Sequence, residues 1–246
     1  MATMRKPQAF GELFVEPSES NVALEPAAAA TPSPELMKEA AVTEPRHSPV
    51  EEIESFFDLI IAELTGLRTR AEADAIERAA DLILESEARG GRVHVTGIGK
   101  SEHIARYVAA LLSSTGTPAY FLHATECIHG SVGQVCAHDV IIAISNSGVT
   151  PELLHAVEVL RASKTKVIAV TGDLDSSLAR MADVLLYAGV DNEGGALNIV
   201  PRASILAKIY VLCALSVALE AHKGVTRQQY ARWHPGGALG RLARGE

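Results

Sequence analysis

Five short apolar segments recur between residues 92 and 187, separated by stretches whose apolar residues have helical spacing. The clearest segment, 140–144, has the sequence Val-Ile-Ile-Ala-Ile without a polar face, which is typical of a strand buried on both sides. The predicted strands are 92–96, 119–122, 139–145, 166–171 and 184–187. The predicted helices are 100–114, 124–128, 151–161, 176–181, 204–222 and 227–233. Repeated strand–helix units predict an α/β fold, with a parallel sheet, helices on both faces and right-handed crossovers.

Two further helices are predicted before the first strand. Apolar residues recur at helical spacing from Ile53 to Leu64, and Gly66 is expected to end this helix. A second pattern of the same kind covers 75–83 and is ended by the glycine pair at 90–91. Two amphipathic helices in this place need a partner surface, which is either the sheet or another subunit.

Residues 1–48 differ in composition from the rest of the chain. Segment 25–34 is Glu-Pro-Ala-Ala-Ala-Ala-Thr-Pro-Ser-Pro, and Pro, Ser and Glu recur around it. Such a segment buries too little apolar surface to offset the entropy cost of ordering the chain. The sequence therefore predicts a disordered leader over 1–48, with a short helix near 34–41. A single domain then covers 49–246 and includes the amino-terminal helices and the carboxyl-terminal helical segment.

Composition narrows the class of protein. The 246-residue chain has a net charge of −8 and no cluster of Lys and Arg, which argues against a nucleic-acid-binding surface. Its three cysteines form no Cys-x-x-Cys pair, which favours reduced thiols in the cytoplasm over a structural zinc site. The longest apolar run, 205–221, is interrupted by Lys208, which indicates a buried helix and no membrane span.

In a parallel sheet of this kind, ligands bind outside the carboxyl ends of the strands. The loop after the apolar strand 140–144 contains hydroxyl and amide side chains, one glycine and a helix start, with Thr150 as the expected N-cap before Pro151. Such a turn is either an ordinary capped connection or a pocket of donors for an anion, most often a phosphate. The candidate ligand-binding residues in it are Ser145, Asn146, Ser147 and Thr150.

A second candidate turn, Thr96-Gly-Ile-Gly-Lys-Ser101, follows the first strand and opens a helix. It lacks the glycine of a P-loop, since position 94 is histidine, and it lacks the third small residue of a dinucleotide fingerprint, since position 102 is glutamate. ATP and NAD are therefore disfavoured. Gly97 and Gly99 still allow the backbone to approach a ligand, with Lys100 at its edge.

Two histidines are candidates for chemistry. His129 lies against Gly130 in the loop at 123–131, where no metalloprotease pattern occurs. His234 precedes Pro-Gly-Gly, a rigid turn that presents an imidazole and that suits a loop histidine as well as a catalytic one. The acidic loop 191–195 is typical of a solvated turn, and the turn at 171–177 is typical of a helix cap.

Several of these segments together resemble the sugar isomerase (SIS) domain, and specifically the arabinose 5-phosphate isomerase family. They are 97–101 (Gly-Ile-Gly-Lys-Ser), 114–118 (Ser-Thr-Gly-Thr-Pro), 129–130 (His-Gly), 143–148 (Ala-Ile-Ser-Asn-Ser-Gly), 182–184 (Ala-Asp-Val) and 234–240 (His-Pro-Gly-Gly-Ala-Leu-Gly). The resemblance covers about 55–240. It implies a three-layer α-β-α sandwich with a five-stranded parallel sheet of the flavodoxin-like kind.

The resemblance also implies an activity, the interconversion of D-arabinose 5-phosphate and D-ribulose 5-phosphate through an enediol, in a homotetramer and without a metal or organic cofactor. The residues that it assigns to the phosphate site are Ser101, Ser145, Ser147 and Thr150. The residues that it assigns to catalysis are Lys100, Glu152, Glu193 and His234, with His129 as a further active-site histidine that is open to inhibitory zinc in some members.

Three departures from the family pattern keep alternatives open. Ser131 replaces the aspartate that commonly follows His-Gly. Segment 195–204 keeps only Leu197, Pro201 and Ser204 of the family's sequence, and it is expected to line the sugar pocket. The paired CBS domains of many members are not expected. The alternatives are an isomerase of a different sugar phosphate and a non-catalytic phosphosugar sensor, although the leader has none of the helix-turn-helix pattern of such regulators.

Overall fold

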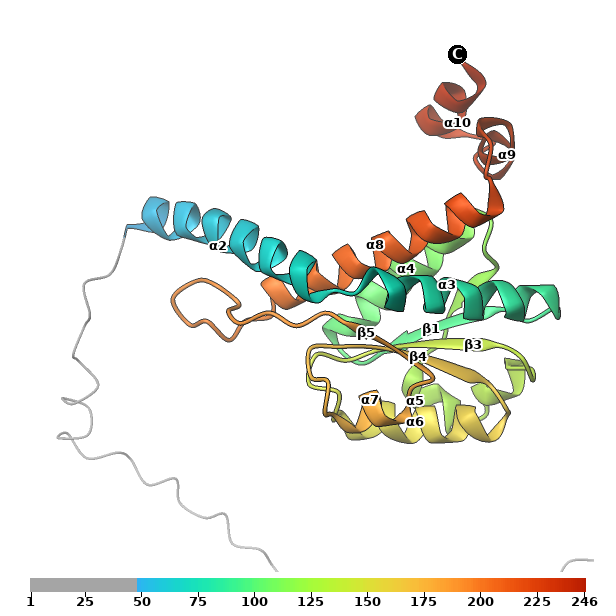
Figure 1. Ribbon diagram of the computed structural model, residues 1–246, viewed down its shortest axis with the longest axis horizontal. Coiled ribbons are helices and arrows are strands. Elements are labelled where there is room, and N and C mark those ends of the chain that lie inside the picture. The colour runs from blue at the N-terminus through green and yellow to red at the C-terminus, as the bar shows by residue number, and fades with distance from the viewer. Residues whose placement is uncertain (1–47) are drawn as a thin grey trace, which may run out of the picture. The chain divides into compact units, whose positions relative to one another are not determined.

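A five-stranded parallel sheet forms the centre of the fold (Figure 1). The computed structural model describes residues 48–246, so the predicted leader and the short helix near 34–41 lie outside the described residues, except for Ser48. The strands are β1 (Val93–Gly97), β2 (Ala119–Phe121), β3 (Val140–Ile144), β4 (Lys166–Thr171) and β5 (Val184–Tyr187). They pair in the order β2-β1-β3-β4-β5, which is the flavodoxin-like order. The predicted α/β fold class is confirmed.

Helices cover both faces of the sheet and complete the three layers (Figure 1). One face is covered by α3 (Ala73–Ala88), α4 (Lys100–Ser114) and α8 (Ala203–Lys223). The other face is covered by α5 (Ala124–Cys127), α6 (Pro151–Ala162) and α7 (Ser177–Met181), with the 3-10 turn η1 (Ser131–Gln134) after α5. Strand β3 shows the reason, since Ile142 and Ile144 enter one core and Ile141 and Ala143 the other.

Helix α2 (Pro49–Arg70) is longer than the sequence predicts. The helix was expected to end at Gly66, but it continues to Arg70, so that expectation is wrong. A glycine inside a helix costs only about 1 kcal/mol, and Leu67, one residue further on, is fully buried in the main core. Tertiary packing therefore outweighs the local signal. The amino-terminal end is set by Ser48, which forms a capping box with Glu51.

Two short helices follow α8. Helix α9 (Arg227–Trp233) agrees with the prediction, whereas α10 (Gly237–Arg244) was not predicted. Its eight residues include two glycines and pack mainly on α9, so its apolar pattern is too short to be recognised in the sequence.

Helix α8 is the one helix in the described part of the chain that has the length and apolar composition needed to cross a bilayer. Half of its apolar window is buried inside the domain, where the helix packs against α3 and α4. Lys208 interrupts that apolar run, and its side chain is fully buried. Since a buried lysine is rare unless it is paired, its surroundings are informative.

Candidate active site

A pocket of about 280 Å³ lies where the strand order reverses, at the carboxyl ends of β1 and β3. This is the place where sheets of this type bind ligands. The predicted residues that line it come from two loops, and they are Lys100, Ser101, Ser145, Asn146, Ser147 and Thr150. The fold thus brings together side chains of two loops that are at least 44 residues apart in the sequence, since Ser101 and Ser145 are the nearest pair.

The loop after β3 is held in a fixed shape by its own hydroxyl groups. The Ser145 hydroxyl oxygen accepts the N–H of Gly148 at 3.1 Å and lies 3.2 Å from the Thr150 hydroxyl oxygen. Thr150 is the N-cap of α6, as predicted, but its side chain makes no capping hydrogen bond, because the hydroxyl is directed to Ser145 instead. The loop after β3, with two serines and one threonine, therefore presents its hydroxyl groups to the pocket rather than to the helix end.

The turn after β1 depends on its glycines. A Cβ on Gly97 would lie 2.9 Å from the backbone of Ser101, and Gly99 has a φ of 60°. Both positions therefore favour glycine. Neither lines the pocket, but together they place Lys100 and Ser101 in the first turn of α4 at its edge. Lys100 is exposed there.

Helix α8 adds three residues that were missing from the predicted set, namely Ser204, Ile205 and Lys208. Lys208 lines the pocket, and its ammonium donates to the Asn146 side-chain oxygen and to the Ser204 carbonyl oxygen, each at 2.8 Å. Desolvation lowers the pKa of Lys208 to about 8, although the negative charge of Glu193 opposes this shift. A lysine within an apolar run was the signal that could have pointed to this residue.

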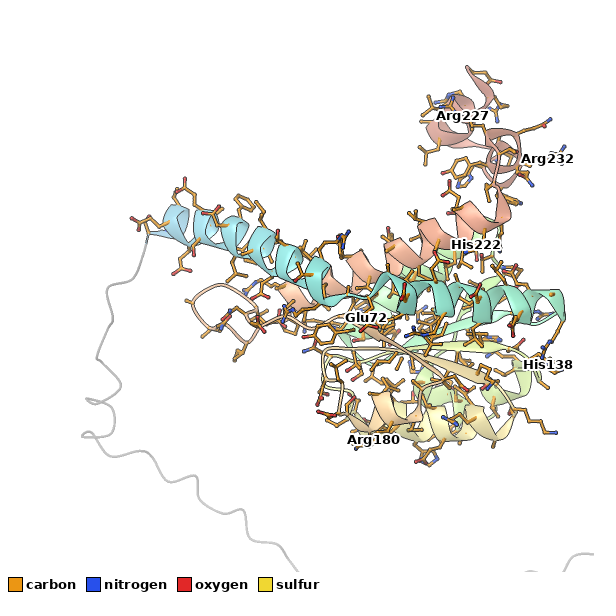
Figure 2. The ribbon with its side chains drawn as sticks, viewed as in Figure 1. Glu72, His138, Arg180, His222, Arg227 and Arg232 are labelled. Carbon is orange, nitrogen blue, oxygen red and sulfur yellow. The ribbon has the colours of Figure 1, made fainter. Side chains whose placement is uncertain are left out.

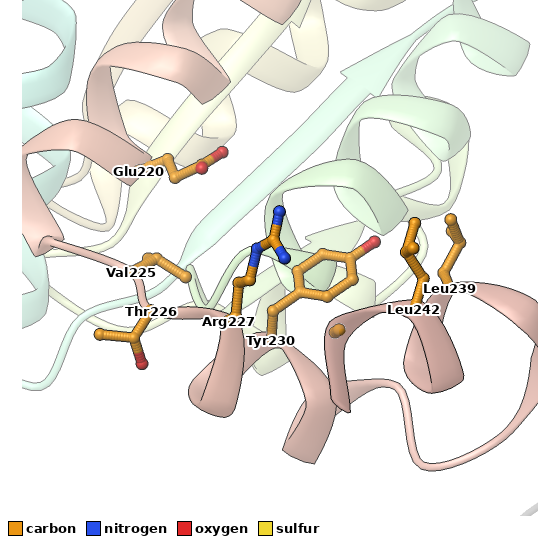
Figure 3. A pocket seen from close by; sticks show the side chains of 8 residues that line it. Glu220, Val225, Thr226, Arg227, Tyr230, Leu239 and Leu242 are labelled. Carbon is orange, nitrogen blue, oxygen red and sulfur yellow. The ribbon is translucent and has the colours of Figure 1, made fainter. Parts of the chain in front are cut away.

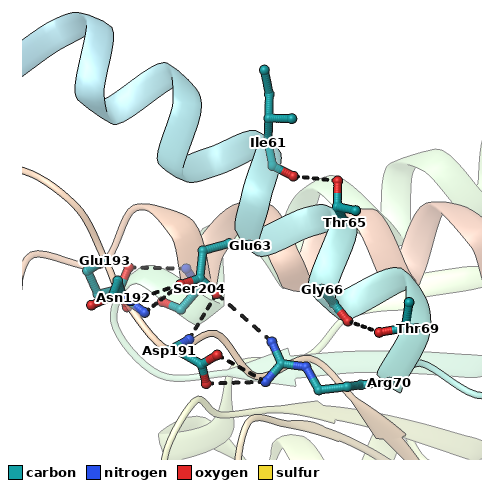
Figure 4. Close-up of polar contacts among 10 residues, drawn as sticks. All are labelled: Ile61, Glu63, Thr65, Gly66, Thr69, Arg70, Asp191, Asn192, Glu193 and Ser204. Atoms are coloured by element: carbon teal, nitrogen blue, oxygen red, sulfur yellow. Dashed lines mark hydrogen bonds and ion pairs between the residues drawn. The ribbon is translucent and has the colours of Figure 1, made fainter.

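Glu193 is held close to this region by a carboxylate on α2 (Figure 4). Glu63, which is almost fully buried, accepts the backbone N–H groups of Asp191 at 2.9 Å and of Asn192 at 2.8 Å. The loop between β5 and α8 is therefore fixed immediately before Glu193. Sequence reasoning assigned no role to Glu63, because nothing in an amphipathic helix pattern distinguishes it.

The Glu193 carboxylate accepts the backbone N–H of Arg202 at 2.6 Å and of Ser204 at 3.1 Å, at the start of α8. Partial burial favours the neutral acid, but the Ser204 side chain, these two N–H groups and the charge of Lys208 outweigh it. The pKa of Glu193 is therefore lowered, and the side chain is ionised at neutral pH. The loop was expected to be a solvated turn, but its Glu193 side chain is hydrogen-bonded to the start of α8.

Segment 195–204 lines the pocket less than expected. Only Pro201 and Ser204 of this segment reach it, whereas Leu197 and Ile199 are exposed. The Arg202 guanidinium, which is new with respect to the family pattern, donates to the Gly194 carbonyl oxygen at 2.8 Å. Most of the residues by which segment 195–204 differs from the family pattern therefore lie on the loop surface or hold the loop in place, and do not line the pocket.

Four predicted catalytic residues do not line the pocket, and Glu193, described above, is the one of them that is held beside it. Glu152 is exposed in the first turn of α6, two residues after Thr150. His129 is exposed just after α5. His234 ends α9 and stacks on Tyr230, with a ring-centroid distance of 3.9 Å. Since a 21-residue helix is about 31 Å long, α8 separates His234 at its far end from the pocket at its start.

Figure 2 shows this separation, because His222 marks the last turn of α8 and Arg232, two residues before His234, lies beyond it. Within one chain, His234 is therefore not brought to the pocket. In the described part of the chain, no three His, Cys, Asp or Glu side chains are grouped as ligands for a metal ion.

The comparison with protein families identifies the class. Residues 86–218 match the model of the SIS domain, and the chain belongs to that family. The matched region includes all five strands and the pocket between them.

Individual relatives narrow the class further. Arabinose 5-phosphate isomerase KdsD of Francisella tularensis is 40% identical over 185 residues, which are 75% of this chain and 56% of that protein. KdsD of Escherichia coli is 46% identical over 151 residues, which are 61% of this chain and 46% of that protein. The chain thus spans about half the length of these curated relatives. A solved Escherichia coli protein in complex with arabinose 5-phosphate has a TM-score of 0.66 and 33% identity, and the match covers 77% of this chain and 100% of that one. The resemblance seen in the motifs is confirmed.

The shape of the loop after β3 can be tested at Gly148. This residue has a φ of +62°, and a Cβ would collide with the Ser176 side chain. We expect Gly148→Ala to lower the free energy of unfolding by about 3 kcal/mol, from backbone strain and overpacking, and to weaken the binding of inorganic phosphate. Urea unfolding and calorimetry measure the two effects.

Gly90→Ala is the matched control, because Gly90 has a φ of +78° and open space around a Cβ. It should cost only about 1 kcal/mol of backbone strain and leave phosphate binding unchanged. Equal losses in both variants would show that the collision with Ser176 is unimportant.

Proposed function

We propose that this chain is a sugar-phosphate aldose–ketose isomerase that interconverts D-arabinose 5-phosphate and D-ribulose 5-phosphate. The observation that carries the proposal is the pocket at the β1–β3 switch, where hydroxyl, amide and lysine side chains converge. Curated relatives named arabinose 5-phosphate isomerase, at 40–46% identity, support the choice of substrate. No metal or organic cofactor is part of the proposal.

Aldose–ketose isomerisation moves a proton between C1 and C2 through an enediol. It requires a base near these carbons, a group that stabilises the charge on the oxygens and an anchor that fixes the substrate. In our proposal the hydroxyl groups of Ser101, Ser145, Ser147 and Thr150 hold the phosphate, with Asn146 beside them. Lys100, at the mouth of the pocket, stabilises the enediolate.

Glu152 or Glu193 removes the proton in this proposal. Glu193 is the better positioned of the two, because its ionised carboxylate is fixed beside the pocket-lining Ser204. Glu152 lies on an exposed turn next to Thr150 and has more freedom to move. His234, or His129, handles the sugar oxygens during ring opening and proton transfer.

We also propose a cytoplasmic protein, since all three cysteines are free thiols and none is paired with another. Burial raises the pKa of the Cys127 thiol to about 11, so this residue is a poor nucleophile or metal ligand at neutral pH.

The activity is tested by incubating the purified protein with a panel of pentose and hexose phosphates in D₂O. We expect NMR to show exchange of the C1 or C2 proton and aldose–ketose conversion, with arabinose 5-phosphate preferred. Conversion of another member of the panel would favour an isomerase with a different substrate. Tight binding without exchange would favour a phosphosugar sensor.

The assignment of catalytic residues is tested by Glu152→Gln, Glu193→Gln and His234→Ala. A residue that transfers a proton should lose about 10²-fold or more in kcat when it is neutralised or truncated. Glu158→Gln is the control, because Glu158 is exposed on the same helix as Glu152 and does not line the pocket. Near-normal turnover in a variant would remove that residue from the mechanism.

The pH profile tests Glu193 as the base. A base works only when deprotonated, so kcat/KM falls as the pH drops through its pKa. Because the pKa of Glu193 is lowered, a reaction that depends on Glu193 should stay active below the usual glutamate range of about 4.3. Loss of activity at or above that range would argue against Glu193 as the base.

We further propose a homotetramer, in which His234 reaches the pocket of a neighbouring subunit. The carboxyl-terminal helices support this, because a hollow of about 210 Å³ lies between the end of α8 and helices α9 and α10 (Figure 3). Leu239 and Leu242, on its rim, are exposed, and so are Phe57 and Ile61 on α2. These apolar side chains need a covering surface.

Size-exclusion chromatography with light scattering tests the assembly. We expect a mass of about 104 kDa, four times the chain mass of 26.1 kDa, and dissociation in a Phe57→Glu, Ile61→Glu double variant with loss of turnover. Leu174→Glu is the control, because this exposed side chain lies on the loop before α7. A monomeric wild type with full activity would contradict the proposal.

A further inference from the structure

Lys208 is a positive charge that has been removed completely from solvent. Its side chain has no exposed surface, although it lines the pocket at the β1–β3 switch. Lys100, the other lysine at this pocket, is exposed and can remain hydrated. A charge in a dry environment interacts more strongly with a ligand than a hydrated one, so the two lysines are not equivalent.

Lys208 uses only part of its capacity to donate hydrogen bonds. An ammonium has three N–H donors, and two of them serve the Asn146 side chain and the Ser204 carbonyl. Within residues 48–246 the third N–H has no protein acceptor. The Ser204 hydroxyl, which also lines the pocket and is buried, forms no hydrogen bond of good geometry, although it lies close enough to Glu193 to help lower the pKa of that carboxyl group. Two unused donors therefore lie at the same pocket, and buried donors without partners are costly unless a ligand satisfies them.

The charged groups around Lys208 do not neutralise it through direct contact. Glu193 acts on it through space, while the Glu193 carboxylate itself is occupied by the N–H groups of Arg202 and Ser204. On α2, Glu63 is bound to the loop at 191–192. On α3, Glu77 and Glu87 pair with His222 and Lys223 at the opposite end of α8. On α4, Lys100 is the charged side chain that lines the same pocket.

We propose that Lys208, with the Ser204 hydroxyl beside it, binds the phosphate of the substrate from the α8 side of the pocket, opposite the loop after β3. The ligand is a dianionic phosphate monoester, which supplies both the negative charge and the acceptor oxygens that the two donors lack. The inference deepens the proposed function and rests on it for the choice of a sugar phosphate. Lys208 lies outside the set of residues that the family resemblance assigns to the phosphate.

A consequence is that ligand binding takes up a proton. Without ligand, desolvation keeps the pKa of Lys208 at about 8, so the amine is largely neutral above that pH. A bound dianion favours the charged form and raises the pKa. Affinity should therefore be full below pH 8 and fall above it, approaching about tenfold per pH unit. Phosphate monoesters are dianions throughout this range, so their own ionisation does not interfere.

The first test uses the wild-type protein and D-arabinitol 5-phosphate, a polyol phosphate without a carbonyl that cannot be isomerised. Calorimetry at pH 8.5 in two buffers of different ionisation enthalpy measures protons exchanged on binding. We expect an uptake of roughly 0.7 proton, the neutral fraction of a group with a pKa of about 8. Binding without proton uptake would overturn the proposal, because a lysine that only holds Asn146 in place gives none.

The second test compares Lys208→Met with Lys223→Met. Methionine fills the same volume without charge, and Lys223 is a half-buried lysine on the same helix that pairs with Glu87 far from the pocket. At pH 7 we expect Lys208→Met to bind D-arabinitol 5-phosphate and inorganic phosphate about 10- to 100-fold more weakly than wild type, with no fall in affinity between pH 8 and 9.5. Lys223→Met should retain the wild-type affinity and pH dependence.

The outcomes separate this proposal from the proposed function. Unchanged affinity in Lys208→Met, or no binding of either probe by the wild type, would overturn the role of Lys208 whether or not the enzyme isomerises sugars. Proton-linked binding that is lost in Lys208→Met would support it even if the NMR panel shows no isomerisation, in which case only the isomerase assignment fails.

Discussion

The buried ammonium of Lys208 is the contact on which the geometry of the pocket depends. Its two hydrogen bonds join the Asn146 side chain, in the loop after β3, to the first turn of α8. Asn146 and Ser204 are 58 residues apart in sequence, and each of the two elements contributes one wall of the pocket. Since a buried charge without partners is strongly unfavourable, this lysine fixes the distance between the walls. Because the buried ammonium needs partners, an anion that enters the pocket interacts with it strongly.

A second buried charge fixes the remaining wall. Glu63 holds the backbone at 191–192, and this places Glu193 against the start of α8, where its carboxylate accepts two N–H groups. Arg70, which lies seven residues after Glu63 on α2, forms an ion pair with Asp191 at 3.2 Å. This contact holds the same loop in place. Helix α2, whose first half carries exposed apolar residues, therefore connects a surface suited to subunit contacts with the position of Glu193. In the proposed tetramer, contacts at this surface would therefore influence the position of Glu193.

The sequence predicts the sheet and the two loops at its edge well, because buried strands and Gly-rich turns have strong local patterns. Strands β4 and β5 and helices α4 and α9 have the predicted bounds. Gly66 was misjudged because packing of Leu67 outweighs a local helix-breaking tendency. Thr150 was assigned as a capping side chain because local spacing does not reveal its competing partner, Ser145.

Lys208 and Glu63 were overlooked for a related reason. The partners of each residue are brought close only by the fold. Glu63 has the pattern of an ordinary charged residue in its helix, and the position of Lys208 within an apolar run indicates burial but does not reveal its partners.

These observations change where the specificity of the pocket is expected to be encoded. Segment 195–204 differs most from the family pattern, yet its exposed residues and the Arg202 contact serve the loop surface and its anchoring. The residues of α8 that enter the pocket are Ser204, Ile205 and Lys208. A lysine among them adds a full positive charge to a site whose other α8 residues are neutral. A buried charge of this kind outweighs several neutral hydrogen bonds, so in the proposed function the phosphate, rather than the sugar hydroxyls, is expected to dominate recognition.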